Sequence, residues 1–222
     1  MVTGSAGFVG RHMVAELERR GWDVDGVDVS SADGWRGLDA LEVFRFHQVR
    51  YDLVVHCAAR SPHRAAIDAA PSMMAYNLQL DAAMFDWAVR THQGRVLYLS
   101  SSAVYPAGLQ RQGAPWLPLE EDLAGGDQIG FPADSYGWTK LTGERMAAAA
   151  AAEGLAVHVV RPFSGYGADQ GPEWPFGAFV GRAHRRDDPF VIWGDGQQVR
   201  DWIHISDLVA GALAVVVADE RR

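Results

Sequence analysis

The sequence is poor in cysteine and contains no long hydrophobic run. Cys57 is the only cysteine among the 222 residues, which excludes an internal disulfide framework and a cysteine-based zinc site. No apolar stretch approaches the roughly 18 residues that cross a bilayer, and the N-terminus does not combine a charged region with an apolar one. We therefore expect a soluble, cytoplasmic protein with no membrane partner.

Positive charge is also scarce. Twenty Lys and Arg residues stand against 28 Asp and Glu residues, and the formal net charge is −8. Surfaces that bind nucleic acid are basic, so this balance argues against a nucleic-acid partner. A phosphate on a small molecule would instead be held locally, by backbone amides at a helix start or by a single arginine.

The apolar content is sufficient for one hydrophobic core. Hydrophobic residues make up 48% of the chain and charged residues 22%, as in ordinary globular proteins. At roughly 150 residues per domain, the length predicts one large domain or one domain with a small appendage. No repeat or linker separates two independent domains.

Short β-branched runs alternate with helical patterns, which is typical of an α/β parallel sheet with crossover helices. The pattern predicts strands at 1–3, 24–29, 52–57, 95–100 and 156–161, and helices at 8–21, 71–92, 135–152 and 205–218. Between residues 30 and 50 the pattern is weak, and we expect a short strand before Asp39 and a helical turn at 41–46. Residues 106–132 lack periodicity and are interpreted as a loop over the carboxyl edge of the sheet, while 163–200 intersperse aromatic residues with Gly and Pro.

A glycine-rich segment follows Thr3, between the first strand and the first helix. Gly4, Gly7 and Gly10 permit a tight turn and let the backbone approach a pyrophosphate at the helix N-terminus. Asp28 closes the next strand, 18 residues beyond Gly10, where a carboxylate can accept hydrogen bonds from an adenosine ribose. Its charge would repel a ribose 2′-phosphate, so NAD is favoured over NADP. The alternative is that the glycines serve only a tight strand-helix junction.

Tyr136 and Lys140 lie four residues apart, on one face of a predicted helix. A tyrosine phenol is a poor base at neutral pH, and a neighbouring ammonium stabilises the phenolate and lowers its pKa. The serines at 100–102 end a strand on the carboxyl side of the sheet, where a hydroxyl could share a substrate oxygen with Tyr136. The alternatives are that Tyr136 and Lys140 are exposed residues with no catalytic role, and that the serines only form a turn at the end of the strand.

The order of these motifs resembles one family. The glycine pattern, the Ser-Ser-Ser-Ala-Val-Tyr-Pro run at 100–106, the Tyr136 and Lys140 pair and the segments 161–167 and 194–204 are similar to the extended short-chain dehydrogenase/reductases that act on nucleotide sugars. The resemblance implies Tyr136 as catalytic base and acid, Lys140 as its pKa partner and a ligand of the nicotinamide ribose, and Ser101 as the catalytic hydroxyl.

The resemblance also implies a set of cofactor-binding residues: Gly4, Gly7, Phe8, Val9, Gly10, Asp28, Asp39, Ala58, Ala59, Tyr136 and Lys140. Two of these expectations have structural alternatives. Asp39 resembles a carboxylate that meets adenine, but it could simply cap a helix. Ala58 and Ala59 match small residues that line the cofactor, but small residues after a buried strand are also ordinary packing.

For the substrate, the resemblance implies contacts from Ser102, Ser164 and Arg200, with Trp193 beside the nucleotide base. Arg200 resembles an arginine that binds the diphosphate, and its alternative is an ion pair with Asp201. Trp193 could equally be a core aromatic. Ser164 stands where many relatives have Asn. His56 and His204 have no companions at metal-ligand spacing, so we interpret both as structural and expect no metal.

The residues after the catalytic hydroxyl favour one reaction within the family. Sugar dehydratases that resemble this chain place an acidic pair there, because elimination of water needs one group to take a proton and another to protonate the leaving hydroxyl. Here the positions hold Ser102 and Ala103. The expected activity is therefore an NAD-dependent nucleotide-sugar epimerase that transiently oxidises a carbinol, most simply C4. The alternatives are a keto-sugar reductase and a non-catalytic nucleotide sensor.

The expected architecture is a Rossmann-like, doubly wound parallel sheet with a small, incomplete substrate-binding portion. Residues 1–162 would form the NAD-binding domain, and 163–222 would add substrate-binding segments and a returning helix that do not form an independent domain. By resemblance, the helices at 71–92 and 135–152 would pair two copies into a homodimer.

Overall fold

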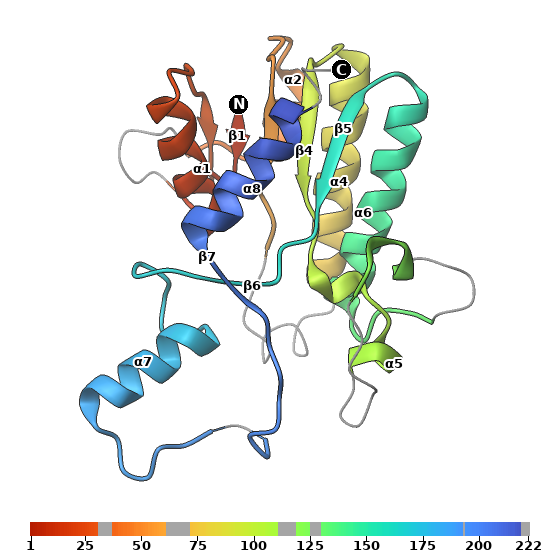
Figure 1. Cartoon of the computed structure of the whole chain (residues 1–222). Helices are drawn as coiled ribbons and strands as arrows, with labels where there is room; N and C mark the ends of the chain where they lie inside the picture. The colour runs from red at the N-terminus through yellow and green to blue at the C-terminus, as the bar shows by residue number, and fades with distance from the viewer. Residues whose placement is uncertain (31–36, 61–71, 111–118, 125–129, 193, 219–222) are drawn as a thin grey trace.

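A parallel sheet of five strands forms the centre of the computed structural model, which describes residues 1–222 except 31–36, 61–71, 111–118, 125–129, 193 and 219–222 (Figure 1). The strand order is β2-β1-β3-β4-β5. The strands are β1 (Val2–Thr3), β2 (Gly26–Val27), β3 (Val54–His56), β4 (Arg95–Leu99) and β5 (Ala156–Val160). The chain leaves β1 toward β2 and returns on the other side as β3. Ligands of open parallel sheets bind at the carboxyl ends of strands beside such a reversal.

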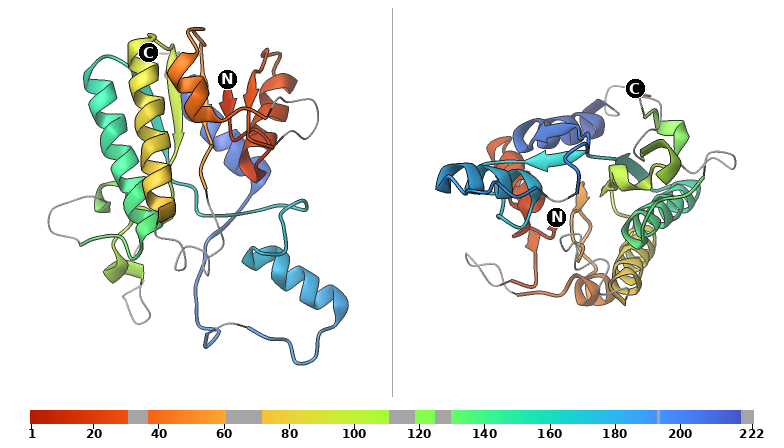
Figure 2. Two further views of the ribbon diagram at one scale, coloured as in Figure 1. Left: turned by 180° about the vertical axis from the view of Figure 1, so that it is seen from behind. Right: turned by 90° about the horizontal axis from the view of Figure 1, so that it is seen from below.

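Helices cover both faces of this sheet (Figure 2). One face packs against α2 (Ala40–Phe46), α4 (Ser72–Arg90) and α6 (Ser135–Ala152), and the other against α1 (Phe8–Arg19) and α8 (Ile205–Ala218). Val54 belongs to the first of these two cores and Val55 to the second, because successive side chains of a strand point to opposite faces. The expected doubly wound α/β fold is confirmed.

A smaller, two-stranded parallel sheet lies past the carboxyl ends of the main strands (Figure 1). It consists of β6 (Ser164–Tyr166) and β7 (Trp202–His204), and α7 (Pro175–Arg185) comes between them in the chain. Aromatic rings hold this portion together. The ring of Phe176 lies 4.2 Å from that of Tyr166 and 5.5 Å from that of Trp202, between centroids.

The structure differs from the expected elements in three places. The strand expected at 24–29 has only two paired residues and is followed by an isolated bridge between Asp28 and Gly37. The expected loop at 106–132 contains α5 (Ala107–Gln110) and a 3-10 turn, η3 (Glu121–Leu123), and 163–200 contain β6 and α7. These short elements have too few residues to show a period, and the glycines of α7 weaken its helical pattern.

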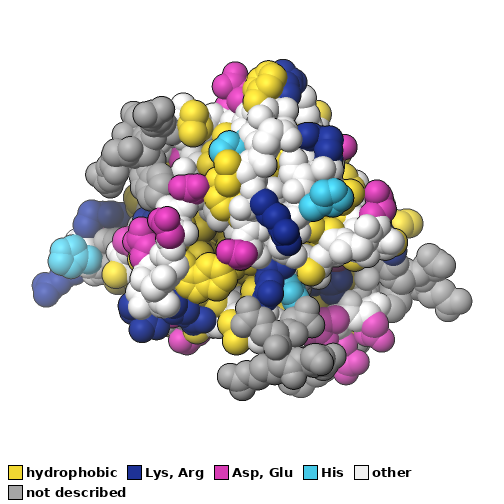
Figure 3. Space-filling model, turned by 90° about the horizontal axis from the view of Figure 1, so that it is seen from above, with side chains coloured by type: hydrophobic (Ala, Val, Ile, Leu, Met, Phe, Trp, Pro, Cys, Tyr) yellow, Lys and Arg dark blue, Asp and Glu magenta, His cyan; other side chains and the backbone are white. Residues whose placement is uncertain are grey.

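The face of the molecule opposite the small sheet has charges of both signs (Figure 3). Among the residues that the structure describes, acidic and basic side chains are interspersed there with hydrophobic ones. Within the described ranges, no helix is long and apolar enough to cross a membrane.

Candidate active site

The glycine-rich turn joins β1 to α1 beside the end of β3, and backbone contacts explain its glycines. Gly4 has a φ of +68°, and a Cβ there would lie 2.7 Å from the backbone nitrogen of Ala58. A Cβ on Gly10 would lie 1.9 Å from the carbonyl oxygen of Gly4. The Gly7 amide donates to that same carbonyl at 3.0 Å. The turn is therefore closed by backbone approaches that other residues would block.

The first turn of α1 follows directly, with Phe8 and Val9 half-buried against the core that α1 shares with α8. No side chain caps this helix at its N-terminus. The first amides of a helix have no partner within it, and together with the helix dipole they favour an anion. The start of α1 can therefore accept a phosphate group.

Asp28 contacts this turn, and its predicted contact with an adenosine ribose stays a prediction. Its Oδ2 accepts a hydrogen bond from the Ala6 amide at 3.0 Å, while Oδ1 accepts from the amide and the hydroxyl of Ser30. Asp39, in contrast, caps α2 by accepting from the Leu41 amide at 2.9 Å. The structural alternative for Asp39 is thus observed, and its contact with adenine stays a prediction.

The structure gives the three serines that follow β4 different surroundings. Ser100 is buried and donates from its hydroxyl to Oε1 of Glu144 at 2.5 Å. Ser101 is half-buried, and its hydroxyl oxygen caps the short turn η2 (Ser102–Val104) by accepting from the Ala103 amide at 3.1 Å. The Ser102 amide donates to the carbonyl of Pro162. Ser100 is therefore structural, and the half-buried hydroxyl of Ser101 is available to a ligand.

Helix α6 begins directly against η2, the short turn that follows Ser101. Asp134 caps α6 by accepting from the Gly137 amide at 2.8 Å. A Cβ on Gly137 would lie 2.3 Å from the carbonyl oxygen of Ala103, so only glycine permits this approach. The half-buried Tyr136 precedes Gly137, and therefore lies on the helical turn that faces the Ser101 segment.

Lys140 lies one turn further along α6 and is buried, with 5% relative exposure. Its Nζ is 4.8 Å from the centroid of the Tyr98 ring. It is also the only lysine in the sequence. All the other permanently positive side chains are arginines. An exposed position, the alternative for this residue, does not agree with its burial.

An ion pair between Glu144 and Arg161 holds the ends of β4 and β5 beside this site. The sequence analysis did not identify Glu144. Arg161 donates from Nε and Nη2 to both carboxylate oxygens of Glu144, and from Nη1 to the carbonyl of Glu121. The hydrogen bonds with Glu144 raise the pKa of Arg161 further above its usual range. The position of Glu144, one turn after Lys140 on the same helix, is the sequence signal that could have indicated it.

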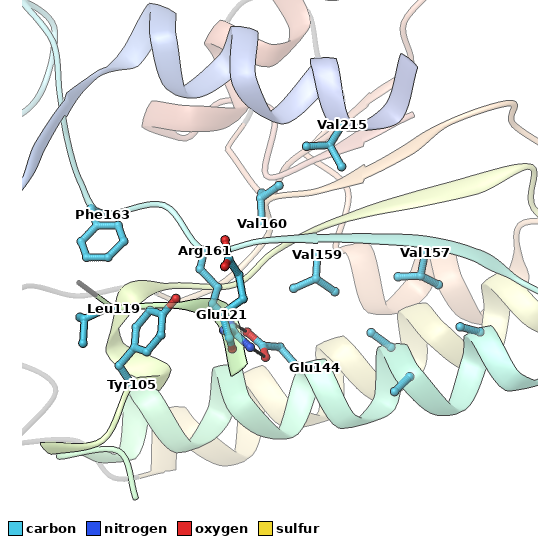
Figure 4. A pocket seen from close by; sticks show the side chains of 13 residues that line it. Tyr105, Leu119, Glu121, Glu144, Val157, Val159, Val160, Arg161, Phe163 and Val215 are labelled. Carbon is cyan, nitrogen blue, oxygen red and sulfur yellow. Dashed lines mark hydrogen bonds and ion pairs between the residues drawn. The ribbon is translucent and has the colours of Figure 1, made fainter. Parts of the chain in front are cut away.

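A cavity of about 600 Å³ lies beside this ion pair, between α6, the open edge of β5 and α8 (Figure 4). Its lining includes Tyr105, Glu144, Arg161 and Phe163 together with alanine and valine side chains. Ser101, Tyr136 and Lys140 do not line it. The cavity is therefore distinct from the candidate active site.

Of the predicted substrate residues, Ser102 lies on η2, whereas Ser164 and Arg200 lie on or next to the small sheet. Ser164 begins β6, and its amide donates to the carbonyl of Asp201. Arg200 is exposed and forms no ion pair with Asp201 or with any other acid in the described part of the chain. Trp193 lies outside the described residues. Ser164 and Arg200 are therefore close in the fold, because β6 pairs with β7 through Ser164 and Trp202.

The two histidines agree with a structural interpretation. His56 is buried and hydrogen bonded to Thr3 and Asp81, and His204 is exposed and hydrogen bonded to Ser206. Among the residues that the structure describes, no three His, Cys, Asp or Glu side chains gather in a way that could hold a metal ion.

Comparison with known proteins extends over the whole chain. The model of the NAD dependent epimerase/dehydratase family matches residues 1–222. A dTDP-glucose 4,6-dehydratase of Actinoplanes sp. is 31% identical over 246 residues, covering 97% of this chain and 72% of that protein. A UDP-glucuronate 4-epimerase of Thermodesulfobacterium geofontis is 29% identical over 242 residues, covering 96% and 70%.

Solved structures agree with this assignment. MoeE5 in complex with UDP-glucose and NAD has a TM-score of 0.76 and 31% identity, covering 96% of this chain and 70% of that one. The UDP-glucuronic acid 4-epimerase from Bacillus cereus, in complex with UDP-glucuronic acid and NAD, has a TM-score of 0.77 and 25% identity, covering 97% and 72%. The chain belongs to the NAD-dependent epimerase/dehydratase family, which confirms the family resemblance and, at the level of the family, NAD as the cofactor.

Proposed function

We propose that this chain is a nucleotide-sugar epimerase that transiently oxidises one carbinol carbon, C4. The packing of the first turn of α6 against η2 is the observation that supports this proposal most directly. Gly137, next to Tyr136, lies against Ala103, two residues after Ser101, and Lys140 follows Tyr136 by one helical turn. A hydroxyl, a phenol and an ammonium so arranged are suited to removing a proton from an alcohol.

The residues around the glycine-rich turn fit NAD. The close backbone approaches of Gly4 and Gly10 and the uncapped start of α1 suit a pyrophosphate, and the Asp28 carboxylate beside the turn suits the adenosine ribose. When bound, NAD supplies the acceptor and later the donor of a hydride. We propose that the same pocket is completed by Gly7, Phe8, Val9, Asp39, Ala58 and Ala59.

In the proposed reaction, the Tyr136 phenolate takes the proton of the sugar hydroxyl while the Ser101 hydroxyl donates a hydrogen bond to the same oxygen. Lys140 stabilises the negative charge on Tyr136. After the keto-sugar has rotated in the site to present its other face, Tyr136 returns the proton to the oxygen. Ser102, Ser164 and Arg200 would hold the nucleotide sugar, and Arg200, exposed beside Ser164, is placed to meet a diphosphate.

The domain arrangement and the dimer also stay proposals. Residues 1–162 would form the NAD-binding part and 163–222 the substrate-binding segments. The long helices α4 and α6 pack side by side against the same face of the sheet. Both have exposed large hydrophobic side chains, Met74 on α4 and Trp138 on α6, which a second copy of the chain could cover.

Two incubations test the reaction: a panel of nucleotide sugars with NAD, and the corresponding nucleotide keto-sugars with NADH. An epimerase inverts one carbon and produces no net NADH, whereas a keto-sugar reductase consumes NADH and a sensor produces neither change. Product stereochemistry by proton NMR and absorbance of NADH distinguish the three outcomes. A net consumption of NADH would favour the reductase and contradict the epimerase.

We expect no 4-keto-6-deoxy product and no deuterium at C5 when a nucleotide hexose is incubated in heavy water. Elimination of water would need an acid-base pair next to Ser101, and Ser102 and Ala103 supply none. Glu144, on α6, is engaged by Arg161 and Ser100. Mass spectrometry and proton NMR measure both species. The appearance of either would show a dehydratase-type acid-base pair elsewhere in the pocket.

We expect NAD to bind at least about 10-fold more tightly than NADP, because the Asp28 carboxylate would repel the 2′-phosphate. Asp28→Asn should narrow this ratio by lowering the repulsion. Asp23→Asn, at an exposed position before the same strand, should leave it unchanged. Fluorescence titration with each dinucleotide provides the dissociation constants. Equal dissociation constants for NAD and NADP in the unmodified chain would contradict the proposed role of Asp28.

A further inference from the structure

A network of buried, hydrogen-bonded polar groups runs beneath the candidate active site, across four elements of the fold, β1, β3, β4 and α4. The hydroxyl of Thr3 is 2.8 Å from Nδ1 of His56, and Nε2 of His56 is 3.1 Å from Oδ1 of Asp81. The hydroxyl of Tyr98 donates to Oδ2 of Asp81 at 2.5 Å. All four residues are at most 1% exposed. Each carboxylate oxygen of the buried Asp81 therefore has a hydrogen-bond partner from the protein itself.

The same network of hydrogen-bonded groups extends to Lys140. Its Nζ lies over the Tyr98 ring, 4.8 Å from the centroid, and the Tyr98 hydroxyl is bonded to Asp81. Helix α6 comes unusually close here, since a Cβ on Gly143 would lie 2.0 Å from the Tyr98 hydroxyl and 2.9 Å from Oδ2 of Asp81. The ammonium of Lys140 and the carboxylate of Asp81 thus lie on adjacent helices and contact the same tyrosine, one at its ring and the other at its hydroxyl.

The electrostatics of Asp81 agree with this geometry. Burial by itself would raise the pKa of this carboxyl group, but the hydrogen bond from His56 and the charge of Lys140 outweigh burial and hold its pKa below the usual range. Asp81 is therefore a buried anion at neutral pH. A buried charge is stable only when it is paired or well hydrogen bonded.

Other ionisable groups on the elements around Lys140 do not offer it a negative charge. Burial raises the pKa of the Cys57 thiol to about 12, and burial with the neighbouring Asp81 raises the pKa of Tyr98 still further. Glu144, further along α6, is paired with Arg161. The remaining ionisable groups are Tyr136 and Arg145 on α6, His56 on β3, Arg95 on β4, and Tyr76, Asp86 and Arg90 on α4. Of these, the acid Asp86 has a side chain that is 76% exposed and pairs with Arg90.

We propose that Asp81 is the counter-charge of Lys140, and that it positions the buried ammonium through the ring and hydroxyl of Tyr98. Asp81 is a positioning residue, because it acts on the reaction through Lys140. Its catalytic consequence rests on the proposed function, in which Lys140 stabilises the Tyr136 phenolate. The pairing itself depends only on burial and charge. At its other end, the network reaches Thr3, directly before the glycine-rich turn.

The single lysine makes the test direct. Protein labelled with ¹³C-lysine, without a lysine-containing tag, shows one side-chain NMR signal set, and its Cε shift follows the protonation of Lys140. Without the Asp81 charge, the buried ammonium is less favourable, so Asp81→Asn should lower the midpoint of this titration by about one pH unit. An unchanged midpoint in a folded Asp81→Asn protein would overturn the proposal.

Asp86→Asn is the matched control. Asp86 lies on the same helix, but its side chain is 76% exposed and paired with Arg90. The substitution changes the net charge by the same amount as Asp81→Asn, so it should leave the Lys140 midpoint within about 0.2 of a pH unit, since exposed charges are screened. An equal shift in both variants would show a nonspecific effect of net charge and would contradict the pairing.

If Asp81→Asn does not fold, the double variant Asp81→Asn, Lys140→Met decides. Removal of both charges leaves neither buried alone, so the double variant should regain a folded state with a cooperative urea transition, which the single variant lacks. If the double variant is no more stable, Asp81 acts only through its hydrogen bonds to His56 and Tyr98, and the proposal fails. Neither measurement uses turnover, so the outcome is independent of whether the epimerase proposal holds.

Discussion

Replacement of Tyr136 by phenylalanine is expected to lower turnover by about 10²- to 10⁴-fold, the usual effect of losing acid-base catalysis. The substitution deletes one hydroxyl from a half-buried side chain, so the fold and the affinity for NAD should persist. Initial rates on a substrate from the nucleotide-sugar panel, with NAD titration and circular dichroism, separate these effects. Lys140→Met should weaken both the rate and cofactor binding.

Tyr51→Phe provides the matched control for this prediction. The Tyr51 hydroxyl donates to Asp25 and contacts His47, at the amino end of β3 and away from the candidate site. Its loss should lower the free energy of unfolding by about 1 kcal/mol and leave turnover unchanged. If Tyr136→Phe instead retained near-normal turnover, the mechanism built on the tyrosine would have to be abandoned.

Gly10→Ala is expected to lower the free energy of unfolding by about 2–3 kcal/mol, in the range of overpacking at a tight backbone contact. The new Cβ would lie 1.9 Å from the Gly4 carbonyl oxygen, so α1 or the glycine-rich turn must shift. The shift should also weaken NAD binding at least 10-fold, about 1.4 kcal/mol. Urea denaturation and dinucleotide titration measure the two losses.

Gly211→Ala is the comparison for this substitution. Gly211 also lies within a helix, α8, but a Cβ added there would meet no neighbouring group within 4 Å. Alanine should therefore stabilise the protein by up to about 1 kcal/mol, the difference in helix propensity. Similar denaturation midpoints for both alanine variants would refute the close contact between Gly10 and Gly4.

The long helices and the inner strands could be predicted because their signals are local. Helix α6 begins after the Asp134 cap and α8 follows β7 directly, and both have the bounds that the sequence pattern indicated, 135–152 and 205–218. The alternation of strands and helices also indicated the parallel sheet, which in turn placed the glycine-rich turn and the serines at one edge.

The sequence alone therefore determined the fold class, the family and the candidate residues Ser101, Tyr136 and Lys140. Only the tertiary structure decided which neighbours these residues have. Ser100 and Ser101 are adjacent in the chain, yet one bonds to Glu144 and the other caps η2. Asp81 lies within an apolar helical stretch, and its partners come from β3 and β4 and, across Tyr98, from α6. Such contacts join residues far apart in sequence, so no local period or spacing could specify them.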